Sequence, residues 1–470
     1  MLILVGVSVT VSINGSLFNT TNESAYKTEI SQIKEALEDE ILQRKANRES
    51  TDDITIADLN IPNKLKNQYK DKLIIMDKDI YYDPAMIEKD NETAWLEEMD
   101  IIANTLLFTY NGSTITGFSE KGYELLNKGV TNFVMPSKYT SDANGKKVEV
   151  TTIGANAFDA TQAGKEACAK IKKMALPNTL TGINHYAFRN CTGLTKIDIA
   201  NTKVTFIGQY SFNNCTNLLE VTFPNTLKAL KSINTTDGSA FKGCTNLQKV
   251  DLSNTQISYI ENFTFQNCTN VAEIKLPSTL KSTGSSVFEN IKGLTKIDLT
   301  NTQLTSIGNY SFMLCTNVQE VILPETVTSI GSQVFKGCKN MEKINLNVTK
   351  ITSISPLTFS ECTKLKSIEI PNTVTSIREG VFQSCTSLET VVLPNALVSI
   401  GRVVFADCPL INEIRIPSTV TSIGQNAFAS NSLVNGKIYV PFTKAEGKPS
   451  GWANDWNNRC KATIIYSDET

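Results

Sequence analysis

Hydrophobic positions along much of the chain follow one pattern, F-x-x-C-x-x-L-x-x-I-x-L-P-x-x-L-x-x-I-G. The segment FMLCTNVQEVILPETV, residues 312–327, is a clear copy of it. From Phe241 onward the pattern recurs at steps of 23 or 24 residues, a regularity that predicts a solenoid. One coil cannot bury its apolar face alone, so neighbouring coils must stack. The repeat phenylalanines are Phe158, Phe188, Phe212, Phe241, Phe265, Phe288, Phe312, Phe335, Phe359, Phe382, Phe405 and Phe428.

Each repeat is predicted to contain one short strand. Apolar and polar residues alternate in L-x-x-I-x-L, which is typical of a strand with one buried face. Proline then ends the strand, and the next apolar pair turns the chain. The F-x-x-C segment forms a tight helical or irregular return with its Phe and Cys inside. Strands of stacked coils pair in parallel at about 4.8 Å, so about thirteen coils predict a rod of roughly 60 Å.

The regular step is interrupted by insertions. DATQAGKEA follows Phe158 near residue 162, KSINTTDGS lies around residue 235, and another insertion lies near residue 140. The segment 113–136 is a partial copy that lacks the Phe and Cys positions. We expect this copy to cap the array.

Cysteine follows the repeat. Cys168 is displaced by an insertion and Cys460 lies outside the pattern. Zinc binding would need paired CxxC or Cys/His spacing, which the sequence lacks. A disulfide between adjacent coils is geometrically conceivable, but a free thiol packs well as a small buried hydrophobe, and we favour a ladder of free thiols. The other nine cysteines lie three residues after a repeat Phe: Cys191, Cys215, Cys244, Cys268, Cys315, Cys338, Cys362, Cys385 and Cys408.

Charged residues also form a row. The residue before the central Ile or Val of the strand alternates in sign between repeats, and stacking would make these side chains neighbours on the exposed face. Such pairs stabilise a sheet weakly and help to fix which coil follows which. The row is Lys196, Glu220, Lys249, Glu273, Lys296, Glu320 and Lys343.

A second row lies two residues further along each strand. It mixes acidic, basic and aliphatic side chains, and solenoids often bind partners on such strand-lined surfaces. The alternative is an ordinary solvated face. The predicted ligand-binding strip is Asp198, Thr222, Asp251, Lys275, Asp298, Ile322, Asn345, Glu369, Val392 and Arg415.

Composition describes a folded protein, with 470 residues, 41% of them hydrophobic and 20% charged. The net charge is −2, so no basic field exists to attract nucleic acid. The single histidine, His185, stands where other repeats have Gln, Asn or Ser, and is interpreted as an ordinary repeat residue. Asn190 and Asn214 begin N-C-T glycosylation sequons, which we interpret as turn chemistry.

Enzyme motifs are absent from the sequence, including GxSxG, the P-loop, GxGxxG after a strand and HExxH. Carboxylates fall in repeat rows, so choosing two of them as an acid–base pair would be arbitrary. We therefore expect no catalytic residues, no cofactor and no metal site.

The N-terminal segment is apolar over residues 1–13. As a helix it would span about 20 Å, short of a ~30 Å membrane core. No basic region precedes it and no small-residue cleavage site clearly ends it, so it is a poor secretory signal. The following residues predict a helix with one apolar face, formed by Ala25, Ile30, Ile33, Leu37 and Ile41.

Residues 49–112 are predicted to form a small adaptor. DKLIIMDKDIYYD, residues 71–83, predicts a β-hairpin. Its Asp77, Asp79 and Asp83 suggest a calcium loop, but the Gly and Glu that an EF-hand requires are absent, so we interpret it as a turn. A short helix is expected to begin at Asn91–Trp95.

The repeats resemble the BspA-like leucine-rich repeats of bacterial and protist cell-surface proteins over residues 113–440, through F-x-x-C-x-x-L-x-x-I-x-L-P at period 23 or 24. The resemblance implies a leucine-rich-repeat solenoid of the α/β type, with a parallel β-sheet and short helical or irregular returns, displayed at the cell surface. It implies adhesion to host proteins or other cells, and no catalytic residues. The ending KIYVPFTKAEGKPSGWANDW resembles the cap of such arrays, with Trp452 and Trp456 covering the last coil.

The N-terminal helix resembles the second half of a type IV pilin-like helix, as carried by surface proteins of Gram-positive anaerobes. The leader, cleavage site and first helical turns of that pattern are missing from the sequence, so we expect the native start upstream of Met1 or a trimmed sequence. A degraded or atypical signal and an ordinary packed helix are the alternatives. The pilin-like reading implies anchoring through the N-terminal helix.

The predicted organisation is therefore an N-terminal helix over 1–48, an adaptor over 49–112, a solenoid over 113–440 and a cap over 441–470. The predicted function is adhesion or protein binding at the extracellular surface, with host or bacterial surface proteins as partners. No nucleic acid is expected as a partner, and contact with the membrane is expected only through the N-terminal helix. The alternative is a structural pilin-like subunit that assembles through that helix.

Overall fold

The structure is a computed structural model. The chain divides into two compact units, one formed by residues 1–150 with 171–179 and the other by 151–170 with 180–470. The described residues are 20–47, 57–69, 73–76, 79–82, 107–141, 146–231, 237–429, 433 and 435–469.

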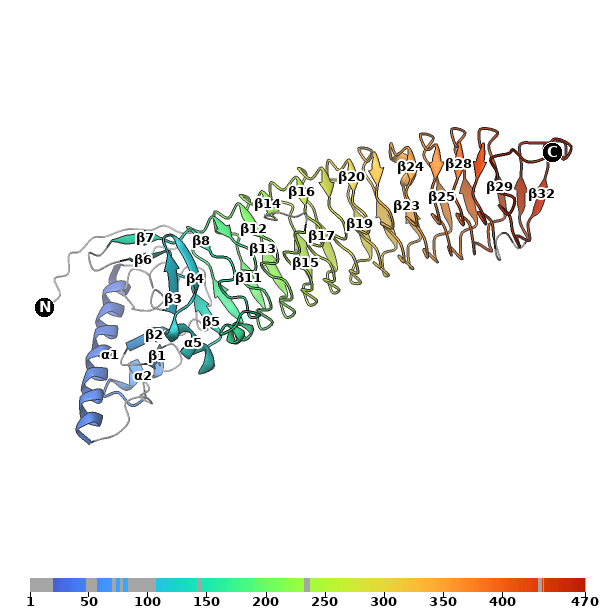
Figure 1. Ribbon diagram of the computed structural model, residues 1–470. Helices are drawn as coiled ribbons and strands as arrows, with labels where there is room; N and C mark the ends of the chain where they lie inside the picture. The colour runs from blue at the N-terminus through green and yellow to red at the C-terminus, as the bar shows by residue number, and fades with distance from the viewer. Residues whose placement is uncertain are drawn as a thin grey trace. The chain divides into compact units, whose positions relative to one another are not determined.

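The first unit begins with helix α1, Thr20–Asn47 (Figure 1). Ile33, Leu37 and Ile41 are buried on it, which confirms that part of the predicted apolar face. The side chains of Ala25 and Ile30 lie outside the described residues, as does the apolar run 1–13. Within the part of the chain that the structure describes, no helix is long and apolar enough to span a membrane.

The predicted hairpin is confirmed in the first unit. Strands β1, Leu73–Met76, and β2, Asp79–Tyr82, pair antiparallel with Met76 opposite Asp79. Asp77, Asp83 and the helix expected at Asn91–Trp95 lie outside the described residues. Helix α2, Asn63–Tyr69, precedes the hairpin.

The partial repeat 113–136 combines strands and a helix. Strand β3, Phe108–Asn111, pairs antiparallel with β4, Thr114–Phe118, and helix α5 follows. The Ser119 hydroxyl accepts a hydrogen bond from the Gly122 N–H at 3.3 Å and caps this helix. The remaining elements are α5, Glu120–Asn127; β5, Asn132–Val134, which pairs in parallel with β9, Lys173–Ala175; and the antiparallel hairpin β6, Lys138–Thr140, with β7, Lys147–Glu149.

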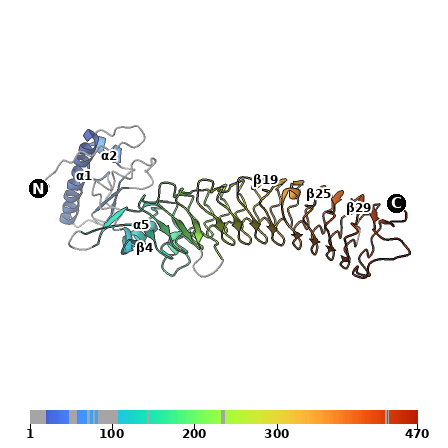
Figure 2. The same cartoon turned by 90° about the horizontal axis from the view of Figure 1, so that it is seen from above.

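The second unit is a solenoid with two rows of short parallel strands along it, visible as successive arrows in Figure 1 and from above in Figure 2. The first row corresponds to the predicted strands and confirms them. Its members are β11 Lys196–Asp198, β13 Glu220–Thr222, β15 Lys249–Asp251, β17 Glu273–Lys275, β19 Lys296–Asp298, β21 Glu320–Ile322, β23 Lys343–Ile344, β25 Ser367–Glu369, β27 Thr390–Val392, β29 Glu413–Arg415, β31 Lys437–Tyr439 and β32 Thr463–Ile465.

The second row differs from the prediction, which expected only a turn after the proline. In most coils a buried Ile follows an outward-facing residue there, so the segment extends and pairs with its neighbours. Its members are β8 Thr152–Ile153, β10 Gly182–Ile183, β12 Phe206–Gly208, β14 Ala229–Lys231, β16 Tyr259–Ile260, β18 Ser282–Thr283, β20 Ser306–Ile307, β22 Ser329–Ile330, β24 Ser353–Ile354, β26 Ser376–Ile377, β28 Ser399–Ile400 and β30 Ser422–Ile423.

The returns between coils are mostly turns, and two short 3-10 helices, Glu166–Lys170 and Leu346–Val348, occur among the described ones. Asn190 and Asn214 each adopt a φ of 57°, the left-handed conformation that asparagine tolerates in turns. This confirms the turn interpretation of the N-C-T triplets.

The core contains a continuous stack of the repeat phenylalanines from Phe158 to Phe428. Neighbouring ring centroids are 5.1 to 5.9 Å apart and the rings are nearly parallel. Trp456 meets the last ring edge-on at 5.6 Å, the contact expected of a cap residue. The stack therefore has an aromatic closure at its C-terminal end.

The cysteines form a second ladder beside the phenylalanines, as predicted. Each of nine thiols donates to the carbonyl oxygen of the Phe in the preceding coil, with Sγ–O distances of 3.0 to 3.3 Å. These nine and Cys168 are buried free thiols, and Cys460 is half-buried. The thiols thus satisfy carbonyl groups that the turns leave inside the core.

Candidate functional site

The charge row forms ion pairs between neighbouring strands of the first row. The Lys196–Glu220, Lys249–Glu273 and Lys296–Glu320 pairs have Nζ–Oε2 distances of 3.3, 3.2 and 3.4 Å. Within the second unit the strands group as β11-β13, β15-β17, β19-β21-β23 and β25-β27-β29-β31-β32. The predicted continuous row is therefore divided into blocks.

Three acidic residues of the predicted strip end their own strands. Asp198, Asp251 and Asp298 each accept a hydrogen bond through Oδ1 from the N–H two residues further on, at 3.0, 3.2 and 3.2 Å. This Asx-turn stands where other coils have proline. Hydrogen bonds from Thr300, together with nearby Lys296, outweigh desolvation and lower the pKa of Asp298. These carboxylates have a structural role.

Four more strip residues also contact the fold itself. The Thr222 hydroxyl donates to Asp198, and Lys275 pairs with Glu273 at 3.3 Å. Ile322 is half-buried opposite Asp298. The Asn345 side chain accepts from the Leu323 N–H at 2.7 Å and donates to the Leu323 carbonyl at 3.1 Å.

The last three strip residues lie side by side on the five-stranded sheet. Glu369 is opposite Val392, and the register of Thr390 with Glu413 places Arg415 next to Val392. The Val392 side chain is 54% exposed.

Tyr439, which the sequence analysis missed, continues this surface. It is opposite Arg415, whose guanidinium lies 3.8 Å from the centre of its ring and 2.9 Å from a Glu413 oxygen. The segment KIYVP repeats the strand-proline part of the pattern and could have revealed it. Hereafter the C-terminal strip means Glu369, Val392, Arg415 and Tyr439.

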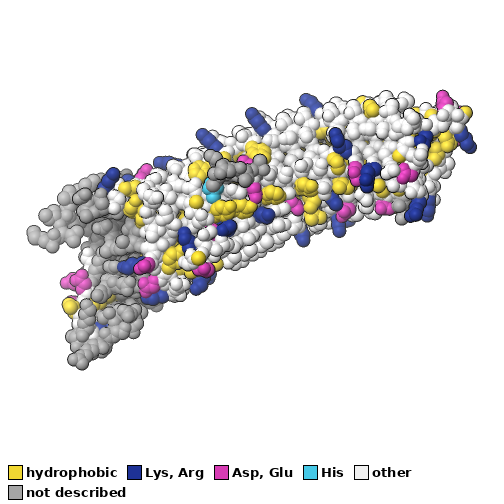
Figure 3. All heavy atoms as spheres, viewed as in Figure 1, with side chains coloured by type: hydrophobic (Ala, Val, Ile, Leu, Met, Phe, Trp, Pro, Cys, Tyr) yellow, Lys and Arg dark blue, Asp and Glu magenta, His cyan; other side chains and the backbone are white. Residues whose placement is uncertain are grey.

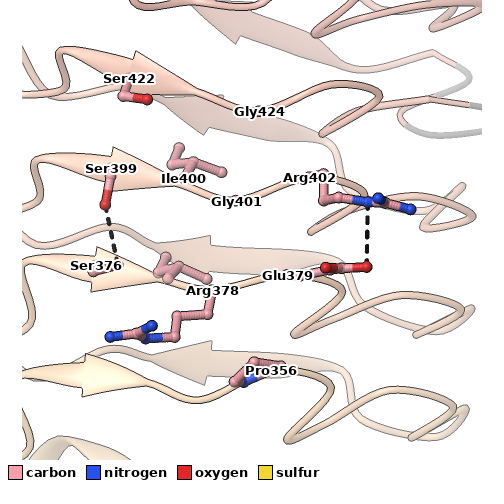
Figure 4. Close-up of a pocket in the computed structure, with 11 residues that line it drawn as sticks. Pro356, Ser376, Arg378, Glu379, Ser399, Ile400, Gly401, Arg402, Ser422 and Gly424 are labelled. Atoms are coloured by element: carbon pink, nitrogen blue, oxygen red, sulfur yellow. Dashed lines mark hydrogen bonds and ion pairs between the residues drawn. The ribbon is translucent and has the colours of Figure 1, made fainter.

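A groove of about 430 Å³ lies on the second row, and the sequence analysis did not predict it. Figure 4 shows its side chains on successive coils, with one hydrogen bond and one ion pair drawn between them. It was missed because only a turn was expected there. Its polar lining comprises Ser376, Arg378, Glu379, Ser399, Arg402 and Ser422.

Reactive groups are scarce. Burial raises the pKa of the Cys315 and Cys408 thiols to about 12, which disfavours the nucleophilic thiolate. The His185 ring accepts a hydrogen bond from the Gln209 N–H at 3.1 Å in the next coil, as a repeat residue would. Among the described residues, no group of three or more His, Cys, Asp or Glu could hold a metal ion. On the face of the second unit in Figure 3, charges of both signs are interspersed.

The stacked coils, parallel strand rows and buried Leu, Ile and Phe positions define a leucine-rich-repeat solenoid. The chain belongs to the BspA type leucine-rich repeat family, whose model matches residues 146–234, 234–362 and 328–445 with six copies. The predicted resemblance and fold class are thereby confirmed. Leucine-rich-repeat solenoids are generally non-enzymatic binding scaffolds.

Solved structures share the fold. A leucine-rich repeat protein from Bacteroides ovatus is 21% identical, with 76% of this chain and 97% of that chain covered and a TM-score of 0.56. A leucine-rich cell surface protein from Faecalibacterium prausnitzii is 20% identical, with 77% and 92% covered and a TM-score of 0.43. The pneumococcal vaccine antigen PcpA is 18% identical, with 76% and 95% covered and a TM-score of 0.41. Comparison with curated protein sequences finds no match.

Proposed function

We propose that this protein is displayed at the cell surface and binds host or bacterial surface proteins through the C-terminal strip. The observation that carries the proposal is the exposed Val392 beside Arg415, which lies over Tyr439. Arg and Tyr are enriched among the residues that dominate protein interfaces. An exposed aliphatic side chain between them offers apolar area for burial.

The strand arrangement also favours binding by side chains at this surface. Strands β27, β29 and β31 have a hydrogen-bonded neighbour on both sides, so their backbone groups are already paired. The first seven residues of the predicted strip mostly serve turns, ion pairs or backbone contacts. Glu369, Val392 and Arg415 are exposed, and we infer that the partner contacts this end.

The test compares two valines with the same substitution. Purified full-length chain is passed over immobilised extracellular-matrix proteins, and its binding to whole bacteria is measured in parallel. Val392→Glu is expected to weaken binding at least about tenfold, because it introduces a charge into the contact. Val398→Glu, at a 45% exposed valine of the second row, is the matched control and should bind normally. Equal binding by both variants, or no binding to any of these surfaces, would contradict the proposal.

Surface anchoring is the less supported part of the proposal. The pilin-like segment 1–19 lies outside the described residues, so anchoring through it stays a prediction. Mass spectrometry of the native N-terminus tests it. A start upstream of Met1, after a cleaved leader and N-methylated, would support a pilin-like anchor, and a mature start near residue 20 would remove it.

A further inference from the structure

The groove on the second row is formed by strands β24, β26, β28 and β30 and the residues that follow them. Strands β26 and β28 are paired on both sides, so an extended peptide cannot add to the sheet there. Any ligand must therefore be recognised by side chains. Those side chains are described below for four successive coils.

Arg378 occupies a repeat position that usually holds glycine. A Cβ on Gly308 would lie 2.1 Å from the Gly284 oxygen, and one on Gly401 would lie 2.7 Å from the Arg378 carbonyl carbon. Close stacking of the coils therefore favours glycine. Packing of the repeat does not explain an arginine at this position, and its side chain is exposed.

The charges in the groove are unequal. Arg402 pairs with Glu379 at a 3.2 Å distance between Nε and Oε1, which neutralises both groups. The Arg378 side chain has no hydrogen-bond or ion-pair partner within the part of the chain that the structure describes, and Figure 4 draws it away from that pair. The groove thus carries one uncompensated guanidinium, which suits a carboxylate because it can donate two parallel hydrogen bonds.

Hydroxyl groups form the other part of the lining. Ser376 and Ser399 are 3.0 Å apart between their oxygens, and Ser422 follows on the next coil. Serine hydroxyls donate and accept, as sugar hydroxyls do. The lining residues include no aromatic side chain, and Ile377 and Ile400 are buried, so the groove lacks the exposed apolar anchor typical of a protein interface.

We propose that this groove binds an acidic saccharide, with a sugar carboxylate on Arg378. Sugar hydroxyls contact the serine row and the Arg402–Glu379 pair. The proposal concerns a different face from the C-terminal strip and does not depend on it. An acidic peptide is the competing ligand, and the experiment separates the two.

Titration calorimetry on the full-length chain tests the proposal, with trigalacturonate and 3′-sialyllactose as acidic sugars, maltotriose as neutral sugar and hexaglutamate as acidic peptide. At least one acidic sugar is expected to bind, at least about tenfold more tightly than the other two probes, because a charged hydrogen bond is lost without the sugar carboxylate. Arg378→Gly restores the residue of neighbouring coils, so it should fold, and it should weaken the acidic sugar about tenfold. Arg415→Gln, an exposed arginine on the first row, is the matched control and should bind normally.

Four results would overturn the proposal. They are no binding of either acidic sugar at about 10 mM, equal losses in both arginine variants, an unchanged affinity in Arg378→Gly, and hexaglutamate binding as tightly as the acidic sugar. Thermal melting of both variants accompanies the titrations, so that a folding defect is not counted as a loss of binding.

Discussion

At the scale of single residues, the buried thiols link the stability of the solenoid to pH. Burial raises the pKa of eight of them above the ordinary value of 9.0, in Cys191, Cys215, Cys244, Cys315, Cys338, Cys362, Cys385 and Cys408. The folded protein keeps them protonated at a pH where the unfolded chain ionises them. Their contribution to folding is complete below the unfolded pKa and is lost as the pH rises toward the folded value.

We therefore expect the urea midpoint of unfolding to fall steeply between about pH 8.5 and pH 10.5. Each thiol contributes about 1.4 kcal/mol per pH unit once the unfolded thiols are ionised. Cys315→Ile copies Ile291, which fills the same position in the coil of Phe288, and should reduce the slope by one thiol. A midpoint that stays constant over this range would contradict the argument. Rapid alkylation of ladder thiols in the native protein at pH 8 would do the same.

The structural roles of single residues were the hardest to predict. Asp198 and Glu369 both follow the central apolar residue of a strand, yet only Asp198 donates its carboxylate to an Asx-turn. The difference depends on whether proline ends the strand, as Pro371 does after Glu369. Sequence rows group such residues together, although physically they belong to two kinds of coil.

At the scale of elements, the first row of strands was predictable because L-x-x-I-x-L carries several alternating positions. The second row was not, because a typical strand there, such as Ser399–Ile400, has one outward and one buried residue. Two residues do not establish a period of two. The groove was missed for this reason, although Arg378 in a glycine position marks it in the sequence.

The glycine position provides a test of coil packing. Gly401→Ala would place a Cβ 2.7 Å from the Arg378 carbonyl carbon and the Glu379 nitrogen, so the backbone must shift. We expect the substitution to cost about 1–3 kcal/mol of stability, as overpacking does. Thermal melting followed by circular dichroism measures it. Arg378→Ala changes a non-glycine residue at the same repeat position and should alter stability by less than about 0.5 kcal/mol. Similar melting of both variants would show that tight packing does not select glycine here.

At the scale of the whole molecule, the second unit behaves as a linear array in which each coil contacts its neighbours. Its C-terminal end is closed by Trp456 on Phe428 and by Trp452, whose indole N–H donates to the Val420 carbonyl at 3.1 Å. Loss of the closure should therefore loosen the adjacent coils and leave distant ones unchanged.

Trp456→Ala is expected to remove about 3–5 kcal/mol locally, the usual cost of truncating a buried Trp. Hydrogen exchange measured by mass spectrometry should show lost protection in residues 400–429 and native protection in residues 241–288. Leu410→Ala, at an exposed leucine, serves as the control and should leave both segments protected. A uniform loss of protection along the solenoid would mean that the array unfolds as one unit.

The alternating charges on the first row have a consequence for how such a chain can lengthen by gene duplication. Copying a single coil would place two lysines or two glutamates side by side, which disfavours the pairing. Copying two coils preserves the order, as the 47-residue spacing from Lys249 to Lys296 and from Lys296 to Lys343 does in this chain. The inheritable unit of growth is therefore a pair of coils, and relatives that keep the alternation should differ in length by multiples of about 47 residues.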